Sequence, residues 1–492
     1  MVERTVEREL PLIFERSRPG RRGVRPPTVE GPDMADLLGE GALREDAPAL
    51  PEVSELDLVR HFTQLAHRQF SIDGNVYPLG SCTMKYNPKV HEDVAAWFAD
   101  VHPSQDPEGA QGVLELLWQL QADLAQVTGM DEVTLQPAAG AQGELTGILM
   151  IRAYHAAHGE DRQRRVVIVP DAAHGTNPAT AGMVGYRVVE VPTAADGEVD
   201  VDALKEALGP EVAAVMLTNP STVGIFESRI QEIAEAAHAV GAQLYYDGAN
   251  LNAIVGKARP GDMGFDVVHL NLHKTFTTPH GGGGPGTGPV GVKAHLAPYL
   301  PHPLVARDEE GRYGLDDARP ASIGRMRSYL GNVGNLVRAY AYLRSLGAEG
   351  LRDVAEMAVL NANYLRVRMR EQGFEPAFDR TCMHEFVARP PEGLRTLDLA
   401  KALLDEGMHP MTVYFPLVVK ESMMVEPTET ESLETLDAYA EALGALLRRG
   451  QEDPAWLKEA PRATPVRRLD EVAAARHPVL RWRPEQAADA AD

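Results

Sequence analysis

The stretch Asn271-Leu272-His273-Lys274-Thr275-Phe276 follows the apolar run 267–270 and carries a lysine just beyond it. A second apolar run ends in Tyr246-Asp247-Gly248, which places an aspartate 27 residues before that lysine (274 − 247). A lysine and an aspartate at the ends of two strands are the layout of an enzyme that carries pyridoxal phosphate. The lysine amine links this cofactor covalently, and the aspartate keeps its pyridine nitrogen protonated so that the ring accepts electrons. We therefore expect Lys274 and Asp247 to be catalytic and to bind the cofactor.

The pattern around these two residues predicts an α/β fold. From about residue 112 to residue 272, short apolar runs alternate with segments of helical spacing. This alternation is typical of a mainly parallel sheet with helices on both faces. Ligands of such sheets bind beyond the carboxyl ends of the strands, so the loops that follow the strands should form the site. The expected strands are 132–136, 166–170, 186–191, 212–219, 244–247 and 267–272.

The sequence pattern divides the chain into four segments. Residues 1–95 are predicted to form an N-terminal arm with a loop that flanks the active site, and residues 96–326 the large cofactor-binding domain. Residues 327–453 are predicted to form a smaller α+β domain, and residues 454–492 a C-terminal tail. The arm contains a basic stretch from Arg16 to Arg25. We interpret it either as a solvated, flexible segment or as a contact with an acidic partner subunit.

Composition limits the compartment and the partners. The chain has 492 residues, of which 44% are apolar and 24% charged, as expected of a globular protein with two or three domains. Its formal net charge of −23 disfavours nucleic acid and anionic membranes as partners. No apolar run approaches the roughly 20 residues that span a bilayer, and the N-terminus does not resemble a secretory signal. Cys82 and Cys382 form neither a disulfide framework nor a zinc pattern, so we expect a cytoplasmic protein.

Two further side chains are candidates for contacts with the cofactor ring. Ala249, two residues beyond Asp247, leaves a small flat surface on which a ring can lie. His174 follows the strand 166–170 and is predicted to be catalytic and to stack on the ring, because an imidazole is planar and polarisable. A lone histidine is more often structural. Asp247 and Lys274 also have ordinary interpretations, as a helix cap or salt bridge and as a surface lysine.

A run of small residues between a strand and a helix predicts the phosphate site. Gly140, Ala141 and Gln142 offer backbone N–H groups at a helix N-terminus, where anions are stabilised. Packing alone is the alternative interpretation of this run. Thr275 is expected to add a hydroxyl to the phosphate, and Asn219 to reach the phenolic oxygen of the cofactor.

The glycine-rich run from Gly281 to Gly288 superficially resembles a dinucleotide-binding pattern. It follows the lysine and not a first strand, and no helix opens from it. We interpret it as a mobile gate or a close backbone approach beside the cofactor. His269 and His273 are four residues apart on a predicted strand and lack the helical geometry of a zinc pair. We assign no metal.

Several strings occur together in this chain. They are Tyr77-Pro78-Leu79-Gly80-Ser81-Cys82-Thr83-Met84-Lys85-Tyr86-Asn87-Pro88, the loop Gln136 to Glu144, Ala173-His174-Gly175-Thr176-Asn177-Pro178, Tyr246-Asp247-Gly248-Ala249-Asn250, and His273-Lys274-Thr275-Phe276 through Pro285-Gly286. Together they resemble glycine dehydrogenase (decarboxylating), the pyridoxal-phosphate P-protein family of the glycine cleavage system. The resemblance covers about residues 56–433, and the length is similar to the lysine-bearing subunit 2 of the split, two-subunit form.

The resemblance implies a pyridoxal-phosphate-dependent transferase fold of type I, similar to aspartate aminotransferase. It implies that glycine forms an aldimine with the cofactor and loses carbon dioxide, and that the aminomethyl group passes to the lipoyl arm of H-protein. It also implies a homologous subunit 1 without the lysine, in an α2β2 heterotetramer. The loop 75–83 and His384 are our hypotheses for the groups that orient the glycine carboxylate. Ala138-Ala139-Gly140 stands where the family commonly has a hydroxyl residue, so backbone amides and Thr275 should bind more of the phosphate.

Two other functions remain open at this point. A serine hydroxymethyltransferase-like enzyme or another amino-acid decarboxylase shares the arrangement of Asp247 and Lys274 but not the string 79–85. A non-catalytic scaffold that only binds a lipoyl carrier is the second alternative. The presence of both Lys274 and Asp247 argues against that scaffold.

Overall fold

The computed structural model describes residues 10–28, 30–39, 41–46, 48–101, 105–280, 286–328 and 330–481. The chain divides into two compact units, one of residues 1–74 with 461–492 and the other of residues 75–460. Residues 281–285 of the predicted glycine-rich gate lie outside the described residues. Among the helices that are described, none combines the length and the apolar character needed to cross a membrane.

The first unit contains short helices and the basic stretch. Its helices are α1 (Met34–Leu38), α2 (Glu55–Ala66) and α14 (Glu471–Arg476). Arg21 of the basic stretch forms an ion pair with Asp57 of α2, with Nη1 2.9 Å from Oδ2. Within α2 only His61 is buried. Most of this amphipathic helix is therefore left uncovered by the described residues.

The second unit is built on a seven-stranded sheet. Its strands are β1 (Glu132–Thr134), β2 (Val166–Pro170), β3 (Arg187–Val191), β4 (Val212–Thr218), β5 (Gln243–Gly248), β6 (Val267–Leu270) and β7 (Val290–Val292), in the order β1-β7-β6-β5-β4-β2-β3. The strands from β2 to β6 pair in parallel, and β7 is antiparallel to both of its neighbours. The predicted mainly parallel sheet is confirmed, whereas β7 was not expected.

Apolar side chains pack on both faces of this sheet. Successive side chains of a strand point to opposite faces, and β5 illustrates the result: Leu244 and Tyr246 join one buried cluster, and Tyr245 joins another. This is why the strand sequences are continuously apolar. The helices beside the sheet are α3 (Val90–Ala96), α4 (Gln111–Thr128), α5 (Gly140–Ala157), α6 (Thr176–Val184), α7 (Val201–Ala207), α8 (Ile230–Ala239) and the single turn α9 (Leu272–Thr275).

Short elements complete this region. They are the 3-10 helices η1 (Pro107–Ala110), η2 (Leu251–Ala253), η3 (Pro260–Met263) and η4 (Ala297–Tyr299), and the hairpin β8 (Leu304–Arg307) with β9 (Tyr313–Asp316). The predicted strand 267–272 is too long, because β6 ends at Leu270 and α9 begins at Leu272. Lys274 therefore lies on a single helical turn beyond the carboxyl end of β6.

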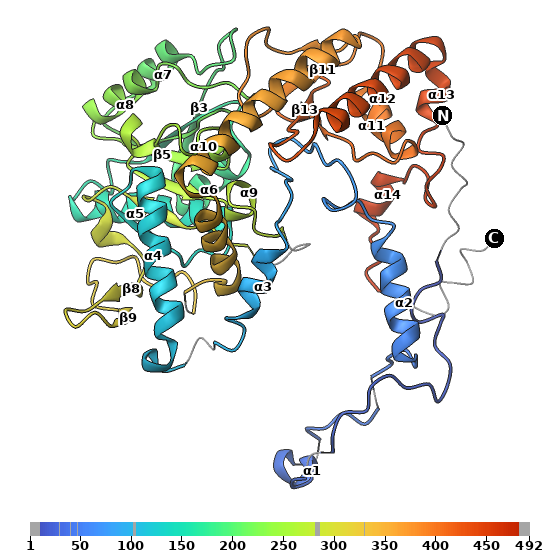
Figure 1. The fold of residues 1–492 in the computed structure, drawn as a ribbon. Helices are drawn as coiled ribbons and strands as arrows, with labels where there is room; N and C mark the ends of the chain where they lie inside the picture. The colour runs from blue at the N-terminus through green and yellow to red at the C-terminus, as the bar shows by residue number, and fades with distance from the viewer. Residues whose placement is uncertain are drawn as a thin grey trace. The chain divides into compact units, whose positions relative to one another are not determined.

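The long helix α10 (Val333–Glu371) leads from the large sheet to a second, antiparallel sheet (Figure 1). It consists of two helices that meet at Gly347, where φ is 61°. The second sheet has the order β10-β11-β13-β12. Its strands are β10 (Glu375–Pro376), β11 (Phe386–Arg389), β12 (Thr412–Val413) and β13 (Met423–Val425), and the helices that follow them in this region are α11 (Thr396–Asp405), α12 (Leu433–Glu452) and α13 (Pro454–Lys458).

The two sheet regions meet closely at Gly224, and this contact predicts a stability difference. A Cβ atom on Gly224, where φ is 79°, would lie 1.9 Å from the Glu385 carbonyl oxygen. Gly159 has a similar φ of 74°, but a Cβ there meets nothing within 4 Å. We expect Gly159→Ala to destabilise by about 1 kcal/mol through backbone conformation alone, and Gly224→Ala by about 3 kcal/mol or more.

Thermal unfolding of both variants at one scan rate tests this. Gly159→Ala controls for the cost of the left-handed backbone. The additional loss of stability in Gly224→Ala therefore measures the close contact between Gly224 and the Glu385 carbonyl oxygen. Equal melting temperatures for the two variants would show that the contact is not tight.

Candidate active site

A cavity of about 260 Å³ lies where strands of the large sheet end. Among the residues predicted from sequence, those that line it are Lys274, Asp247, His174, Ala249, Gly140 and Ala141. Ser81 of the hypothesised loop 75–83 and Ala139 of the predicted small-residue run also line it. The lining residues that the sequence did not indicate as site residues are Glu144, Thr176, Thr218, Thr222, Asn271 and His273. Gln142, Asn219 and Thr275 lie nearby in the chain but do not belong to the lining. The structure thus brings most of the predicted site together.

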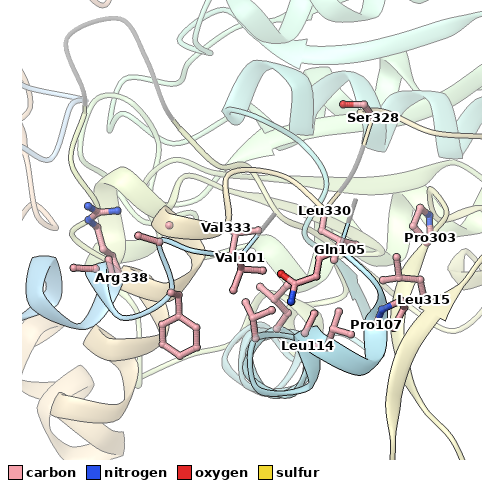
Figure 2. Close-up of a pocket in the computed structure, with 18 of the residues that line it drawn as sticks. Val101, Gln105, Pro107, Leu114, Pro303, Leu315, Ser328, Leu330, Val333 and Arg338 are labelled. Atoms are coloured by element: carbon pink, nitrogen blue, oxygen red, sulfur yellow. The ribbon is translucent and has the colours of Figure 1, made fainter. Parts of the chain in front are cut away.

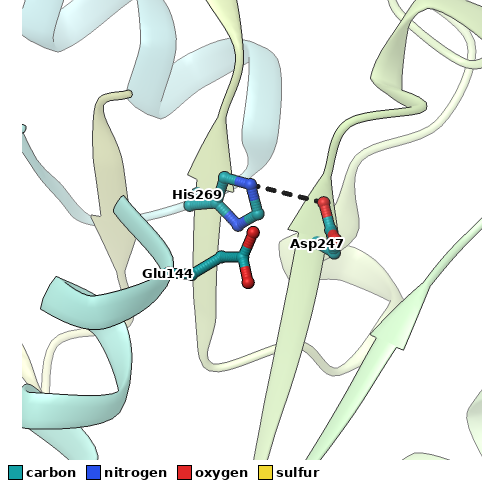
Figure 3. Close-up of side chains that lie close together, drawn as sticks. All are labelled: Glu144, Asp247 and His269. Carbon is teal, nitrogen blue, oxygen red and sulfur yellow. Dashed lines mark ion pairs between the residues drawn. The ribbon is translucent and has the colours of Figure 1, made fainter. Parts of the chain in front are cut away.

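Asp247 is buried at the carboxyl end of β5. Its Oδ1 accepts a hydrogen bond from the Ala249 N–H at 2.9 Å, and its Oδ2 accepts one from Asn177 Nδ2 at 3.0 Å. His269 pairs with Asp247 across β5 and β6, and its Nε2 lies 3.3 Å from Oδ1 (Figure 3). Burial pushes the pKa of Asp247 up, but His269 and the two hydrogen bonds outweigh it and hold the pKa below its usual value. Asp247 is therefore an anion at neutral pH.

Glu144, one turn into α5, faces the same aspartate (Figure 3). Atoms of its carboxyl, of Asp247 and of His269 lie within 4.8 Å of one another. Asn177 donates to both carboxyls, because its Nδ2 is also 2.9 Å from Glu144 Oε2. Burial and the negative charge of Asp247 raise the pKa of Glu144 to about 9. Since two carboxyls this close do not both ionise, the pair keeps one proton, and it resides on Glu144.

His174 lines the cavity from the loop after β2. Its Nδ1 accepts hydrogen bonds from the Thr176 hydroxyl at 2.8 Å and from the Thr176 N–H at 3.3 Å. The ring also makes an edge contact with Phe415, with 5.7 Å between the ring centroids. Burial lowers the pKa of His174. A neutral imidazole with a fixed orientation is what a stacking partner requires.

The N-terminus of α5 forms a cradle of backbone atoms. Gly140 begins the helix, and a Cβ atom there would lie 2.0 Å from Asn271 Oδ1. A Cβ on Gly288 would lie 2.1 Å from the Ala139 carbonyl oxygen. Glycine is favoured at such close approaches, and Gly140 and Ala141 of the first helical turn line the cavity. The Gln142 side chain does not contribute, because it binds the Ala138 N–H and the Met326 carbonyl oxygen.

Asn219 and Thr275 are buried beside the cavity with free polar atoms. Asn219 Oδ1 accepts a hydrogen bond from the Glu227 N–H at 3.0 Å, whereas its Nδ2 has no hydrogen-bond partner among the described residues. Thr275 Oγ1 also has none there. Buried polar atoms are normally paired, so both side chains have bonding capacity left for a polar ligand.

The histidines around Lys274 are neutral. Burial, with the nearby His280 and Lys274, lowers the pKa of His273 to about 3. The His280 ring donates from Nε2 to the His273 carbonyl oxygen at 2.8 Å. His384, our hypothesis for a carboxylate-orienting residue, is fully buried and does not line the cavity, whereas Ser81 of the loop 75–83 does.

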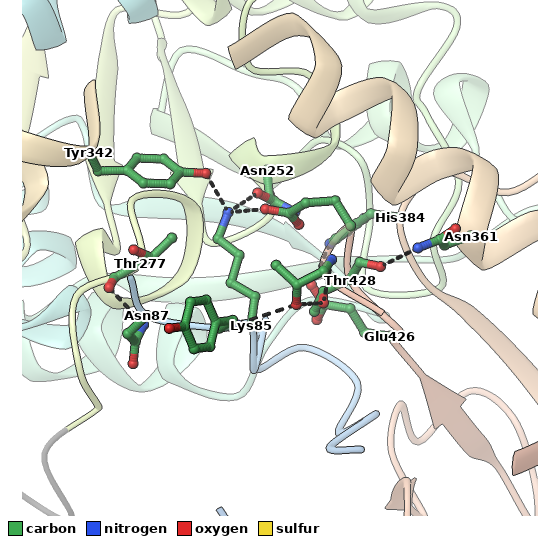
Figure 4. Close-up of polar contacts among 12 residues, drawn as sticks. Lys85, Asn87, Asn252, Thr277, Tyr342, Asn361, His384, Glu426 and Thr428 are labelled. Atoms are coloured by element: carbon green, nitrogen blue, oxygen red, sulfur yellow. Dashed lines mark hydrogen bonds and ion pairs between the residues drawn. The ribbon is translucent and has the colours of Figure 1, made fainter. Parts of the chain in front are cut away.

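A buried lysine fixes the loop that carries Ser81. Lys85 Nζ donates to Asn252 Oδ1 and Glu429 Oε1, each at 2.7 Å, and to the Tyr342 hydroxyl at 3.2 Å (Figure 4). Burial lowers the pKa of Lys85, but the Glu429 charge more than offsets this and raises it overall. Lys85 is therefore a cation that anchors the loop and not a candidate for carrying a cofactor.

A larger cavity of about 600 Å³ has a different character (Figure 2). Its lining is largely apolar and includes Leu114, Leu315, Leu330 and Val333, together with Arg338. None of the site residues predicted from sequence lines it. The smaller cavity contains the lysine, the buried anion and the helix N-terminus, and we therefore place the candidate active site there.

Comparison with known families defines the class of the protein. Residues 147–304 match the aminotransferase class-V family, and residues 354–453 match the C-terminal domain of glycine dehydrogenase. The chain thus has the fold of the pyridoxal-phosphate-dependent class-V aminotransferases, with an additional C-terminal domain.

Individual relatives narrow this further. The chain is 64% identical, over 96% of its length and 98% of the relative's, to a probable glycine dehydrogenase (decarboxylating) subunit 2 of Thermus thermophilus. It is 59% identical to the protein of the same name from Desulforamulus reducens, over 96% of this chain and 99% of that one. A crystal structure of the glycine decarboxylase (P-protein) of the glycine cleavage system, in inhibitor-bound form, is 25% identical with a TM-score of 0.72, covering 84% of this chain and 95% of that chain. The chain belongs to the glycine dehydrogenase (decarboxylating) subunit 2 family, and it is an enzyme.

The raised pKa of Glu144 predicts a pH-dependent effect of Glu144→Gln. The folded protein keeps the Glu144 proton up to a pH of about 9, whereas an unperturbed glutamate releases it near 4.5. The unfolded state therefore binds fewer protons in this window, and the wild type loses stability as the pH rises through it, by at most about 1.4 kcal/mol per pH unit. The neutral glutamine does not titrate. We expect the melting temperature of Glu144→Gln relative to the wild type to increase steadily with pH.

Melting curves of both proteins across that pH window provide the measurement. A difference in melting temperature that is independent of pH would mean that Glu144 is already ionised in the folded protein.

Proposed function

We propose that this chain decarboxylates glycine with pyridoxal phosphate held on Lys274 and transfers the aminomethyl group to the lipoyl arm of H-protein. One observation carries the proposal: Asp247, at the carboxyl end of β5, and Lys274, just beyond the adjacent strand β6, line the same cavity. The 64% identity to a glycine dehydrogenase (decarboxylating) subunit 2 supports glycine as the substrate.

The residues of the cavity fit the cofactor. The Lys274 amine would hold it covalently, and the N–H groups of Gly140 and Ala141 would bind its phosphate at the N-terminus of α5. Thr275 Oγ1 and Asn219 Nδ2, both buried and unpaired among the described residues, would bind its remaining polar oxygens. A donor set of amides, hydroxyls and one amine suits an anionic aldehyde.

The charged and neutral side chains of the cavity have different roles in the proposed reaction. When bound, the cofactor supplies an electron-poor ring that accepts the electron pair left by the departing carboxylate. Asp247 is ionised and can hold a proton at the ring nitrogen, while Glu144 keeps its own proton and adds no second charge. His174 would cover the ring, and Ala249 would leave room for it, since both residues line the cavity. Neutral His273 adds no positive charge that would stabilise the substrate carboxylate and slow its loss.

Lys274→Ala tests the proposal. We expect the wild type, with subunit 1 and lipoylated H-protein present, to exchange labelled carbon dioxide with the carboxyl group of glycine. Lys274→Ala should abolish both this exchange and the absorbance band of the lysine-bound cofactor, because no other amine replaces the link. Lys458→Ala, at an exposed lysine of α13, is the matched control and should retain both. Exchange in Lys274→Ala, or none in the wild type, would contradict the proposal.

We also propose that the chain assembles with a homologous subunit 1 into an α2β2 heterotetramer. The names of the relatives, which denote a second subunit, support this. The helix α2 supports it further, because Leu56, Val59 and Phe62 lie within one side of the helix and each is 55% exposed. Exposed apolar stripes of this kind are typical of contact surfaces. A cytoplasmic location stays a prediction from the sequence.

Replacing this stripe should weaken the assembly. The triple variant Leu56→Gln, Val59→Gln and Phe62→Gln is expected to bind subunit 1 at least about tenfold more weakly, because burial of these side chains is lost. Arg60→Gln, an exposed residue of α2 outside the stripe, introduces the same side chain and should bind normally. Light scattering and titration of the purified subunits give the measurement, and normal assembly of the triple variant would place the partner elsewhere.

A further inference from the structure

Two glutamates face each other inside the protein at the end of the second sheet. Phe386 of β11 pairs with Val425 of β13, so Glu385 and Glu426, one step beyond, stand opposite each other in an antiparallel ladder. Both side chains are 0% exposed. Like charges directly opposite and away from water repel strongly. The pair is therefore compatible with the interior only if it holds a proton or a balancing positive charge.

The loop 79–83 orients each carboxyl through its backbone. The Ser81 N–H donates to Glu385 Oε2 at 2.7 Å, and the Thr83 N–H donates to Glu426 Oε2 at 2.9 Å. Both loop residues have positive φ, 64° and 48°, which is uncommon outside glycine. These bonds use one oxygen of each carboxyl. The other oxygen of Glu426, Oε1, has no hydrogen-bond partner within the described residues and is free to carry a proton.

His384 lies beside Oε1 of both carboxyls, of which Glu385 Oε1 also accepts a hydrogen bond from Asn250 Nδ2 at 3.3 Å. His384 Nε2 is 3.8 Å from Glu426 Oε1 and 4.0 Å from Glu385 Oε1, and Figure 4 shows His384 in the same polar cluster as Glu426. The ring is 0% exposed, and neither nitrogen is hydrogen-bonded to a described residue. Burial lowers the pKa of His384 to about 3. A neutral imidazole with both nitrogens free can accept a proton at one and release a proton from the other.

This cluster adjoins the Lys274 cavity. Ser81, whose N–H binds Glu385, lines that cavity together with Lys274. Burial and the facing carboxyl raise the pKa of Glu385, and burial raises that of Glu426, although the Lys274 charge acts in the opposite direction on both. Two carboxyls that face each other away from water do not both ionise, so the pair keeps at least one proton. The titratable and charged groups that act on the cluster from the surrounding elements include Cys82, Lys85, Lys274, His280, Cys382 and Glu429.

We propose that Glu385, Glu426 and His384 form a proton store that serves the Lys274 cavity and supplies the proton taken up when a disulfide substrate is opened there. The inference rests on the proposed function. In that reaction the electron pair left by carbon dioxide forms a carbon–sulfur bond, and the sulfur–sulfur bond breaks. The second sulfur leaves with its electron pair and takes a proton to become a thiol. The disulfide is reduced, the glycine carbon is oxidised, and the store is refilled from solvent.

Other acids of the cavity are less suited to this step. Asp247 is ionised, and the Glu144 proton relieves repulsion with Asp247. The amine of Lys274 also lines the cavity and is a rival donor. If Lys274 supplies the proton, removal of the glutamate proton leaves the reaction unchanged, and this separates the two possibilities.

Glu426→Gln tests the store, because glutamine still accepts the Thr83 N–H but has no proton to release. We expect the loading of lipoylated H-protein with labelled aminomethyl groups to be slowed at least about tenfold. The wild-type rate should fall at high pH as the store loses its proton, and this fall should be absent in Glu426→Gln. Cofactor absorbance and the KM for glycine should not change.

Two further variants serve as controls. Glu426→Asp should restore part of the rate, and Glu441→Gln, at an exposed residue of α12, should behave as the wild type.

Infrared spectroscopy of the cofactor-free chain gives a readout that does not depend on turnover. At neutral pH a carbonyl band of a protonated carboxyl, shifted in heavy water, should be present in the wild type and reduced in Glu426→Gln. An unreduced band, or full transfer with the wild-type pH profile in Glu426→Gln, would overturn the inference while the proposed function stands. An inactive wild type would overturn both, so the two failures are distinguishable.

Discussion

The negative charge of Asp247, held inside the protein at the end of β5, is the constraint on which the site depends. An isolated carboxylate in the interior would neutralise itself by binding a proton. Here the Ala249 N–H and Asn177 donate hydrogen bonds to it. His269 is held beside it by the Tyr245 hydroxyl, 2.8 Å from Nδ1, and by Asn271 Nδ2, 3.3 Å from Nε2. These partners come from β5, β6 and α6, so the sheet order itself keeps the aspartate ionised.

The number of donors explains why two buried carboxyl pairs behave differently. Asp247 receives a backbone N–H, a side-chain amide and an imidazole, and it ionises while Glu144 keeps the proton. Glu385 receives the Ser81 N–H and, at 3.3 Å, the Asn250 side-chain amide, whereas Glu426 receives the Thr83 N–H, and His384 lies beyond hydrogen-bonding distance of both carboxyls. Their pKa values are therefore both raised. One pair thus supplies a fixed negative charge near Lys274, and the other supplies protons.

Much of the fold followed from continuous apolar runs. The bounds of β2 were predicted without error, because the run 166–170 is apolar throughout and its neighbours are polar. The strand β7 is three residues long and follows the glycine-rich run, so it gave no periodic signal. The helix α6 contains Pro178 and Gly182, which favour a loop when read locally. Proline is nevertheless tolerated in the first turn of a helix, and packing against α5 supplies the stability that the local sequence lacks.

Some site residues were found from the sequence and others were missed, and the difference depends on whether their position follows from sequence order alone. Lys274, Asp247 and His174 each follow a strand end, and in a parallel sheet the carboxyl ends lie along one edge, so position in the sequence was enough. Glu144 had a usable signal, since it lies four residues after Gly140 and a helix brings such positions to the same face. His269 had none, because its role comes from pairing with Asp247, and that pairing requires β5 and β6 to be neighbours.

The pairing of Glu385 with Glu426 likewise requires β11 beside β13, in register, with the two partners 41 positions apart in the chain (426 − 385). Groups that act from a strand end can therefore be predicted from sequence order, whereas groups that act through a cross-strand partner are revealed only by the topology that joins them.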